Sequence, residues 1–252
     1  MGDQKNTLLN ADVGARVTGQ DIYEISDKAR CALGTRLVLG DRVFRYCKNG
    51  SLALNPGYLV QAKPINATYD EDIVVPTTSA IGSKTVYITI HSSYGTTMAL
   101  DELADGYVVV GVAGTGAKIG ECYKIKSNTA AAAGATCTIT LYDPLIEAVT
   151  AGQNTMAIVR SPYKDVVLGA STGAVIGVPI ISVTAAYYFW AQTYGPVGGV
   201  AGGALVAGDP VMDNSNGTFL ITTITTKKTF VGFAMTDIDS GDGGPIFLQI
   251  AP

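Results

Sequence analysis

Charged side chains, histidine and tryptophan are scarce in this chain of 252 residues. Charged residues make up 15% of the sequence, the formal net charge is −4, and histidine and tryptophan each occur once. A surface that binds nucleic acid normally needs clustered lysine and arginine, and no such cluster is present. We therefore predict that nucleic acid is not a partner.

Cysteine is also sparse, and its spacing excludes the common metal sites. The four cysteines are Cys31, Cys47, Cys122 and Cys137, and the single histidine is His91. No two cysteines form a C-x-x-C pair, and no histidine stands near enough to complete a zinc-binding pattern. We predict free, mostly buried thiols, with no metal and no cofactor.

The stretch 166–208 has no charged side chain, and 47% of the whole chain is apolar. A run of this length raises the question of a membrane span. It contains Pro179, Pro196 and many glycines, and its apolar part is rich in Val, Ile, Thr and aromatic residues, which favour strands. We therefore predict buried sheet and no membrane partner.

Apolar residues elsewhere alternate with a period of two, which is typical of strands. Turns rich in Gly, Asn, Asp and Pro separate the runs, and helix signals occur only at 26–33 and 143–151. We predict all-β domains of the sandwich, jelly-roll or barrel-like kind, with at most one or two short helices. The alternating runs are 35–46, 85–91, 122–126, 137–142 and 219–225.

The composition changes twice along the chain. Residues 1–30 are polar and lack sustained alternation, which predicts an extended N-terminal arm. A second change near residue 162 predicts a β-rich domain over 31–162 and another over 163–252, with one continuous domain as the alternative.

The glycine-rich segment YVVVGVAGTGAKIG at 107–120 is not a phosphate-binding loop. Gly120 comes one residue too late for G-x-G-x-x-G, and Ala117 stands where a Walker-type loop needs lysine. A strand follows instead of the helix whose N-terminus would hold the phosphate. We predict a turn between two strands.

A second motif, GASTG at 169–173, fits the G-x-S-x-G pattern of a nucleophilic serine. Hydrolases with this motif place their histidine after the serine, whereas His91 precedes Ser171. We predict a glycine-rich turn and no catalytic residues, and keep a serine esterase using Ser171 as an alternative.

His91 closes an alternating strand, which predicts a position at a sheet edge. The carboxylates at 237–242 lack the ligand order of an EF-hand, so we interpret them as a polar loop. The acidic run at 70–72 could pair as acid and base, and we interpret it as a solvated loop. Neither group predicts a metal site.

Aromatic residues gather around the single tryptophan. In a strand, Tyr188 and Trp190 face one side, and Tyr187 and Phe189 face the other. Such a strand is either buried on both faces or uses one face to contact a neighbouring subunit. Tyr188 and Trp190 are therefore candidate contacts to a neighbouring subunit, with core packing as the alternative.

The order of these elements resembles β-rich structural proteins of tailed-phage virions, of the capsid decoration or cement type. The segments that carry the resemblance are LGTRLVLGDRVFRYCKNG (33–50), LADGYVVVGVAGTGAKIGECYKIKSN (103–128), ITLYDPLIEAV (139–149), GVPIISVTAAYYFWAQTYGPVGGV (177–200) and TFVGFAMTDIDSGDGGPIFLQI (229–250).

The resemblance implies a non-enzymatic protein, made in the host cytoplasm, that binds the outer surface of the capsid. It implies the major capsid protein as partner and a homotrimer as the assembled form. Leu8 and Leu9, the adjacent apolar pair of the arm, are further candidate contacts to the capsid or to a neighbouring copy. A tail or fibre component that binds a receptor is the alternative.

Overall fold

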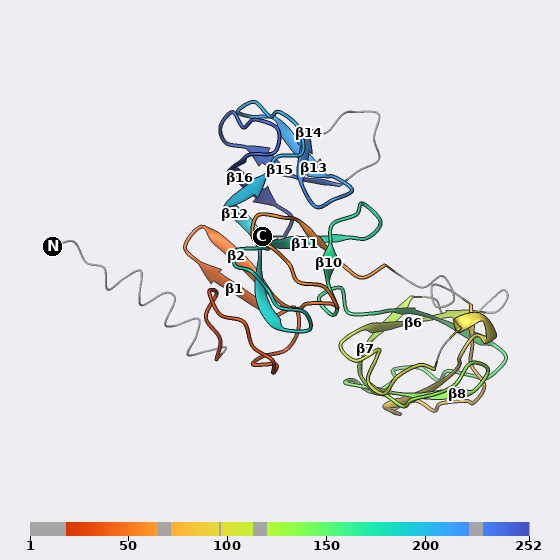
Figure 1. Cartoon of the computed structure of the whole chain (residues 1–252). Helices are drawn as coiled ribbons and strands as arrows, with labels where there is room; N and C mark the ends of the chain where they lie inside the picture. The colour runs from red at the N-terminus through yellow and green to blue at the C-terminus, as the bar shows by residue number, and fades with distance from the viewer. Residues whose placement is uncertain (1–18, 65–71, 96, 113–119, 222–228, 252) are drawn as a thin grey trace. The chain divides into compact units, whose positions relative to one another are not determined.

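The computed structural model describes residues 19–64, 72–95, 97–112, 120–221 and 229–251. The chain forms two compact units. Unit 1 combines Met1–Pro64 with Pro162–Pro252, and unit 2 is the continuous stretch Ile65–Ser161. Both units are built from antiparallel strands (Figure 1), which confirms the predicted all-β class.

Unit 1 holds a ten-stranded sheet within the described residues. Its strands are Arg36–Leu39 (β1), Arg42–Lys48 (β2), Val60–Gln61 (β3), Val167–Leu168 (β10), Val175–Pro179 (β11), Tyr188–Val200 (β12), Pro210–Asp213 (β13), Phe219–Ile221 (β14), Phe230–Ala234 (β15) and Gly243–Gln249 (β16). Eight of them follow the order β10-β3-β11-β12-β16-β15-β13-β14. Off this path, β2 pairs with β12 and with β1.

The strand β12 organises this sheet. Its first half pairs with β2 and its second half with β16. A register shift between Gln192 and Tyr194 marks a bulge, which bends the strand where it changes partner. The uncharged stretch 166–208 thus forms sheet as predicted, and no helix of the described chain is long and apolar enough to cross a membrane.

Side chains cover β12 on both faces. Trp190 is fully buried with Phe44 and Tyr46 on one face, and Phe189 is fully buried with Cys47 on the other. The predicted alternation of the aromatic residues is confirmed. Because both faces are covered, Trp190 has the core-packing role, and Tyr188 is only half-buried beside it.

The described part of the predicted arm, residues 19–30, packs on unit 1 and so is not an extended arm. Gln20 is buried, its amide donates to the backbone oxygen of Tyr188, and its backbone oxygen accepts from the indole of Trp190. Hydrogen bonds of buried polar groups hold this segment in place. Because the segment has no alternating apolar pattern, the sequence period did not reveal its packing. The candidates Leu8 and Leu9 lie outside the described residues.

Unit 2 is a six-stranded curled sheet within the described residues. Its strands are Ile73–Val74 (β4), Thr85–Thr89 (β5), Tyr107–Val112 (β6), Glu121–Asn128 (β7), Thr136–Leu141 (β8) and Asn154–Val159 (β9), with a short 3₁₀ helix at Ser92–Tyr94 (η1). The order is β4-β9-β6-β7-β8-β5, and the terminal strands β4 and β5 approach each other. The sheet therefore curls into a half-barrel (Figure 1).

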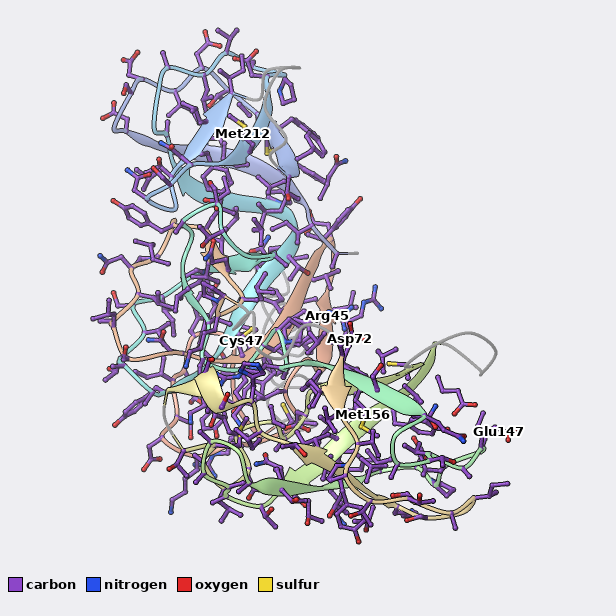
Figure 2. The ribbon with its side chains drawn as sticks, turned by 90° about the vertical axis from the view of Figure 1, so that its right-hand side faces the viewer. Arg45, Cys47, Asp72, Glu147, Met156 and Met212 are labelled. Carbon is purple, nitrogen blue, oxygen red and sulfur yellow. The ribbon has the colours of Figure 1, made fainter. Side chains whose placement is uncertain are left out.

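The interior of this half-barrel is apolar. Met156 on β9 belongs to its core, where Val108 and Ile158 are also buried (Figure 2). Since successive strand residues point to opposite faces, the neighbours of these core residues lie on the outer face.

Neither predicted helix forms. Residues 26–33 contain turns and an isolated bridge between Ser26 and Tyr188. In 143–151, Leu145 and Val149 are buried and form backbone hydrogen bonds with Ser83 and Ser79. Long-range pairing thus overrides the local helix signals.

The division into units differs from the predicted domains. A boundary near residue 162 is present, but residues up to Pro64 join the C-terminal stretch instead of the middle of the chain. The reason is pairing between distant strands, since β3 pairs with both β10 and β11.

Candidate binding surface

The glycine-rich segment 107–120 joins two paired strands. Tyr107 lies opposite Lys124, and Val110 opposite Glu121, so β6 and β7 form an antiparallel pair. The prediction of strands on both sides of the glycines is confirmed, and residues 113–119 between them lie outside the described part of the chain.

Ser171 belongs to a hydrogen-bonded turn of unit 1. Its hydroxyl donates to the backbone oxygen of Asp213 at 3.2 Å, and its backbone N–H donates to the Asp213 carboxylate at 3.0 Å. The side-chain oxygen of Gln61 accepts from the backbone N–H groups of Ala170, Thr172 and Gly173. The contacts of Ser171 are therefore those of a structural turn, as the sequence predicts.

His91 also has a structural role. It is exposed beyond the end of β5, which is a terminal strand of its sheet, and its Nδ1 accepts from the backbone N–H of Ser93 at 3.0 Å. In this way it caps the short helix η1. The predicted position at a sheet edge is confirmed.

Within the described residues, no three or more His, Cys, Asp and Glu side chains gather where they could hold a metal ion. The four cysteines are free, as predicted, although Cys122 is exposed. Burial raises the pKa of the Cys47 and Cys137 thiols above the usual value. Because the thiolate is the reactive form, these two thiols are expected to be inert.

The most distinctive surface lies on the outer face of unit 2. Tyr107 on β6 stands opposite Val159 on β9 and opposite Lys124 on β7. Tyr142, just after β8, extends this row, because its N–H donates to the backbone oxygen of Lys124 at 3.0 Å. The Lys124 ammonium lies 5.8 Å from the centre of the Tyr142 ring, within reach of a cation–π interaction.

A second row runs parallel to the first. Val109 on β6 lies opposite Ala157 on β9 and Cys122 on β7. One row further along, the exposed Val74 on β4 lies opposite Thr155 on β9. We call the whole surface the outer apolar face. Its members are Val74, Tyr107, Val109, Cys122, Lys124, Tyr142, Ala157 and Val159.

The outer apolar face leaves large apolar side chains in contact with water. Tyr107 is 39% exposed, Tyr142 45% and Val159 41%, while the alternate residues Val108, Tyr123 and Ile158 fill the core. Lys124 is the one charged side chain among its eight members. Contiguous apolar surface with tyrosines and little charge is typical of a site that binds another protein.

Sequence reasoning missed this face. The available signal was the run Tyr107 to Val110, which is apolar at both odd and even positions and so offers an apolar side chain to each face of the sheet. The candidates chosen instead, Tyr188 and Trp190, lie in unit 1, where Trp190 is fully buried.

The fold and this surface together define an all-β protein of two curled antiparallel sheets with an exposed apolar face on one of them. No protein-family model matches the chain, and no curated protein is significantly similar to it. Among solved structures, it is similar to the head fiber gp8.5 N base of bacteriophage phi29, with a TM-score of 0.27 and 12% identity over 66% of this chain and 96% of that chain. A TM-score of 0.27 does not establish a common fold.

Proposed function

We propose that this chain is a non-enzymatic structural protein of a tailed-phage virion. In this proposal it binds the outer surface of the capsid and bridges neighbouring capsid subunits. The observation that carries the proposal is the outer apolar face of unit 2, where Tyr107 and Val159 stand exposed opposite each other on the adjacent strands β6 and β9, and Tyr142 stands exposed just after β8. Burying such a face against another protein removes apolar area from water and stabilises the complex.

The proposed partner is the major capsid protein, with Tyr107, Tyr142 and Val159 as the central contacts. Tyrosine is a frequent anchor of protein interfaces because its large ring has few rotatable bonds. Leu8, Leu9 and Tyr188 remain candidate contacts from the sequence. Trp190 does not, because it is buried in the core of its own unit.

We further propose that the protein assembles as a homotrimer. A trimer on an icosahedral lattice engages several capsid subunits at once, so that weak contacts add through avidity. Three chains of 26.1 kDa give a particle of about 78 kDa, which light scattering of the purified protein should report. A stable mass of one chain would contradict the trimer.

The alternative is a tail or fibre component with the same composition and fold. The location of the protein in the particle distinguishes this alternative from a capsid-surface protein. The esterase alternative gains no support, because the Ser171 hydroxyl donates to a backbone oxygen and the His91 side chain caps the short helix η1.

Binding to empty heads tests the proposal. Purified protein is added to heads that lack it, and we expect saturable binding and heads that survive heating or osmotic shock better than uncoated ones. Gold-labelled antibody should then mark the capsid surface. Labelling confined to tails would favour the fibre alternative, and no binding to any part of the particle would overturn the virion proposal.

A further inference from the structure

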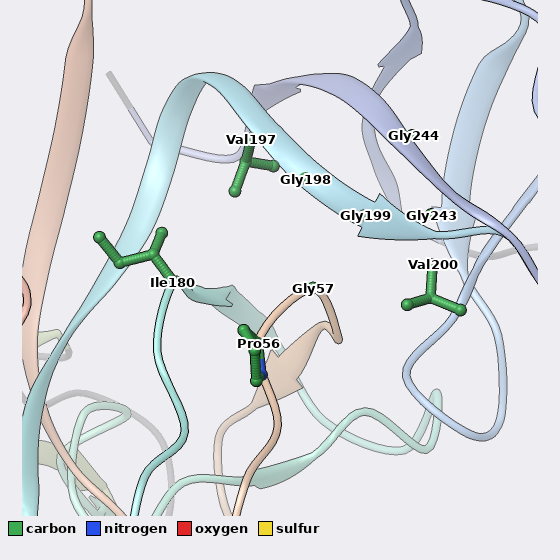
Figure 3. Close-up of a pocket in the computed structure, with 9 residues that line it drawn as sticks. All are labelled: Pro56, Gly57, Ile180, Val197, Gly198, Gly199, Val200, Gly243 and Gly244. Atoms are coloured by element: carbon green, nitrogen blue, oxygen red, sulfur yellow. The ribbon is translucent and has the colours of Figure 1, made fainter.

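A groove in unit 1 is lined without any charged side chain. It has a volume of about 420 Å³ and lies where the second half of β12 pairs with β16 (Figure 3). Its walls are Pro56, Ile180, Val197 and Val200. Its remaining lining residues are the glycines Gly57, Gly198, Gly199, Gly243 and Gly244.

Packing explains only some of these glycines. A Cβ on Gly199 would lie 2.6 Å from the Phe219 ring, and one on Gly244 would lie 2.5 Å from Ile238. By contrast, a Cβ on Gly198 would meet no atom within 4 Å. At Gly198 the fold accepts a side chain, so the uncovered backbone there provides room for something that enters the groove.

The groove adjoins the place where the N-terminal segment is held. Ile180 lines the groove, and it also packs against the cluster formed by Ile22, Phe44, Tyr46 and Trp190. Ile22 is the apolar residue that fixes the start of the described chain in this cluster, and Gln20 is hydrogen-bonded beside it. Through Ile180, one wall of the groove therefore adjoins the cluster that holds the start of the described chain.

The sequence before Gly19 contains a segment of matching chemistry. Residues 6–11, NTLLNA, are uncharged between Lys5 and Asp12 and contain the pair Leu8 and Leu9. Leu9 lies ten positions before Gly19, and an extended chain of ten steps spans up to about 33–36 Å. The pair can therefore reach the groove from its own anchor.

We propose that the groove binds Leu8 and Leu9 of the same chain, so that the N-terminal segment continues its packing along unit 1. Burial of two leucine side chains against Val197, Val200 and Ile180 drives the docking. The lack of charge in both the groove and residues 6–11 avoids the cost of burying an unpaired charge. This inference concerns the free protein and does not depend on binding to a capsid.

Photo-crosslinking of the full chain tests it. A benzoyl-phenylalanine placed at Leu9 is irradiated in free protein mixed from isotopically light and heavy chains, and crosslinked peptides are identified by mass spectrometry. We expect crosslinks to residues 197–200 or 243–244 within one isotopic chain. Crosslinks to the groove between light and heavy chains would show that the groove binds the N-terminal segment of a second copy. Crosslinks only to residues outside the groove would show that Leu9 does not bind there. Either result overturns the proposal.

Matched variants sharpen the experiment. Gly198→Val, at a position where a Cβ meets no atom within 4 Å, fills the groove and should lower the crosslink yield by about tenfold, a loss of about 1.4 kcal/mol in docking. Gly243→Val, whose nearest atom to a Cβ lies at 4.0 Å, is the second filling variant. Ala174→Val, at an exposed position before β11, is the control and should leave the yield unchanged. An undiminished yield in both filling variants would contradict docking in the groove.

Discussion

Tyr46 joins the N-terminal segment to the sheet of unit 1. Its side chain is fully buried, its hydroxyl donates to the side-chain oxygen of Gln20 at 2.7 Å, and it accepts from the backbone N–H of Arg30 at 3.0 Å. Desolvation raises its pKa to about 12. The fold therefore favours the neutral phenol.

This burial predicts a loss of stability at high pH. The pKa of tyrosine in an unfolded chain is about 10, below the folded value of about 12. The contribution of the neutral phenol to the free energy of unfolding is fully present below pH 10 and is lost as the pH rises toward 12. We expect the free energy of unfolding, measured in urea, to fall over this range, and to fall less steeply in Tyr46→Phe.

Tyr46→Phe should also lower the stability at neutral pH by about 1–3 kcal/mol, because the hydrogen bonds of the Tyr46 hydroxyl with the side-chain oxygen of Gln20 and the backbone N–H of Arg30 are lost. Tyr23→Phe, at an exposed tyrosine, is the control. Equal slopes above pH 10 in Tyr46→Phe and the original protein would contradict this account of the pKa.

Single residues show what the sequence could predict. The alternation of Tyr187, Tyr188, Phe189 and Trp190 was predicted correctly, because the period of a strand is a local property. The sequence left open whether Trp190 is buried or contacts a neighbouring subunit, because its covering side chains come from residues 22–46, far away in the sequence. An alternating pattern specifies which side chains share a face, and distant segments decide whether that face is covered.

At the scale of elements, β12 contains glycines with opposite requirements. Gly195 lies at the bulge with a φ of +86°, and a Cβ there would lie 2.4 Å from the backbone oxygen of Asp41. Gly198, three residues further along, has open space around it. One glycine is needed by the bend, and the other is not.

Alanine at the two positions should therefore differ. Gly195→Ala should lower the free energy of unfolding by at least about 1–3 kcal/mol, since it adds backbone strain to a clash with rigid backbone. Gly198→Ala should leave stability unchanged within about 0.5 kcal/mol. Denaturant unfolding of the two variants checks this, and equal destabilisation would argue against the bulge at Gly195.

Strands were more predictable than helices for a physical reason. The runs 85–91 and 137–142 correspond to the paired strands β5 and β8, because alternation reflects one buried face. The helix signals at 143–151 were misleading, since Leu145 and Val149 bond to residues 79–83 instead of to their own neighbours. Local propensity cannot reveal such pairing.

At the scale of the whole molecule, the two units differ in how the chain forms them. Unit 2 is the continuous stretch Ile65–Ser161 and has its own apolar core, whereas unit 1 needs both Met1–Pro64 and Pro162–Pro252. A continuous stretch with its own core can fold by itself.

We predict that the isolated fragment 65–161 folds cooperatively. Its thermal unfolding should be a single transition that gives the same midpoint by circular dichroism and by tyrosine fluorescence. The separate fragment 1–64 should not fold alone, because β2 and β3 pair with strands from the C-terminal stretch. A fragment 65–161 without a cooperative transition would contradict its independence.

The composition change near residue 162 was visible in the sequence, but the insertion of one unit into the other was not. Two-residue strands such as β3 and β10 carry no detectable period, yet their pairing joins segments more than a hundred residues apart. The outer apolar face was missed for a related reason, because its rows form across β9, β6 and β7 and are not continuous in the chain.

The most direct test of the central claim is co-sedimentation with empty heads of the original protein and of the double variant Tyr107→Thr, Val159→Thr. Both changes lie on the outer face of the sheet and should leave the fold intact. Leu52→Thr, at a residue that is 77% exposed in unit 1, is the matched control. We predict saturable binding by the original and control proteins and at least about tenfold weaker binding by the double variant. Equal binding by the folded double variant, or no binding by the original protein, would contradict the claim that the outer apolar face binds the capsid.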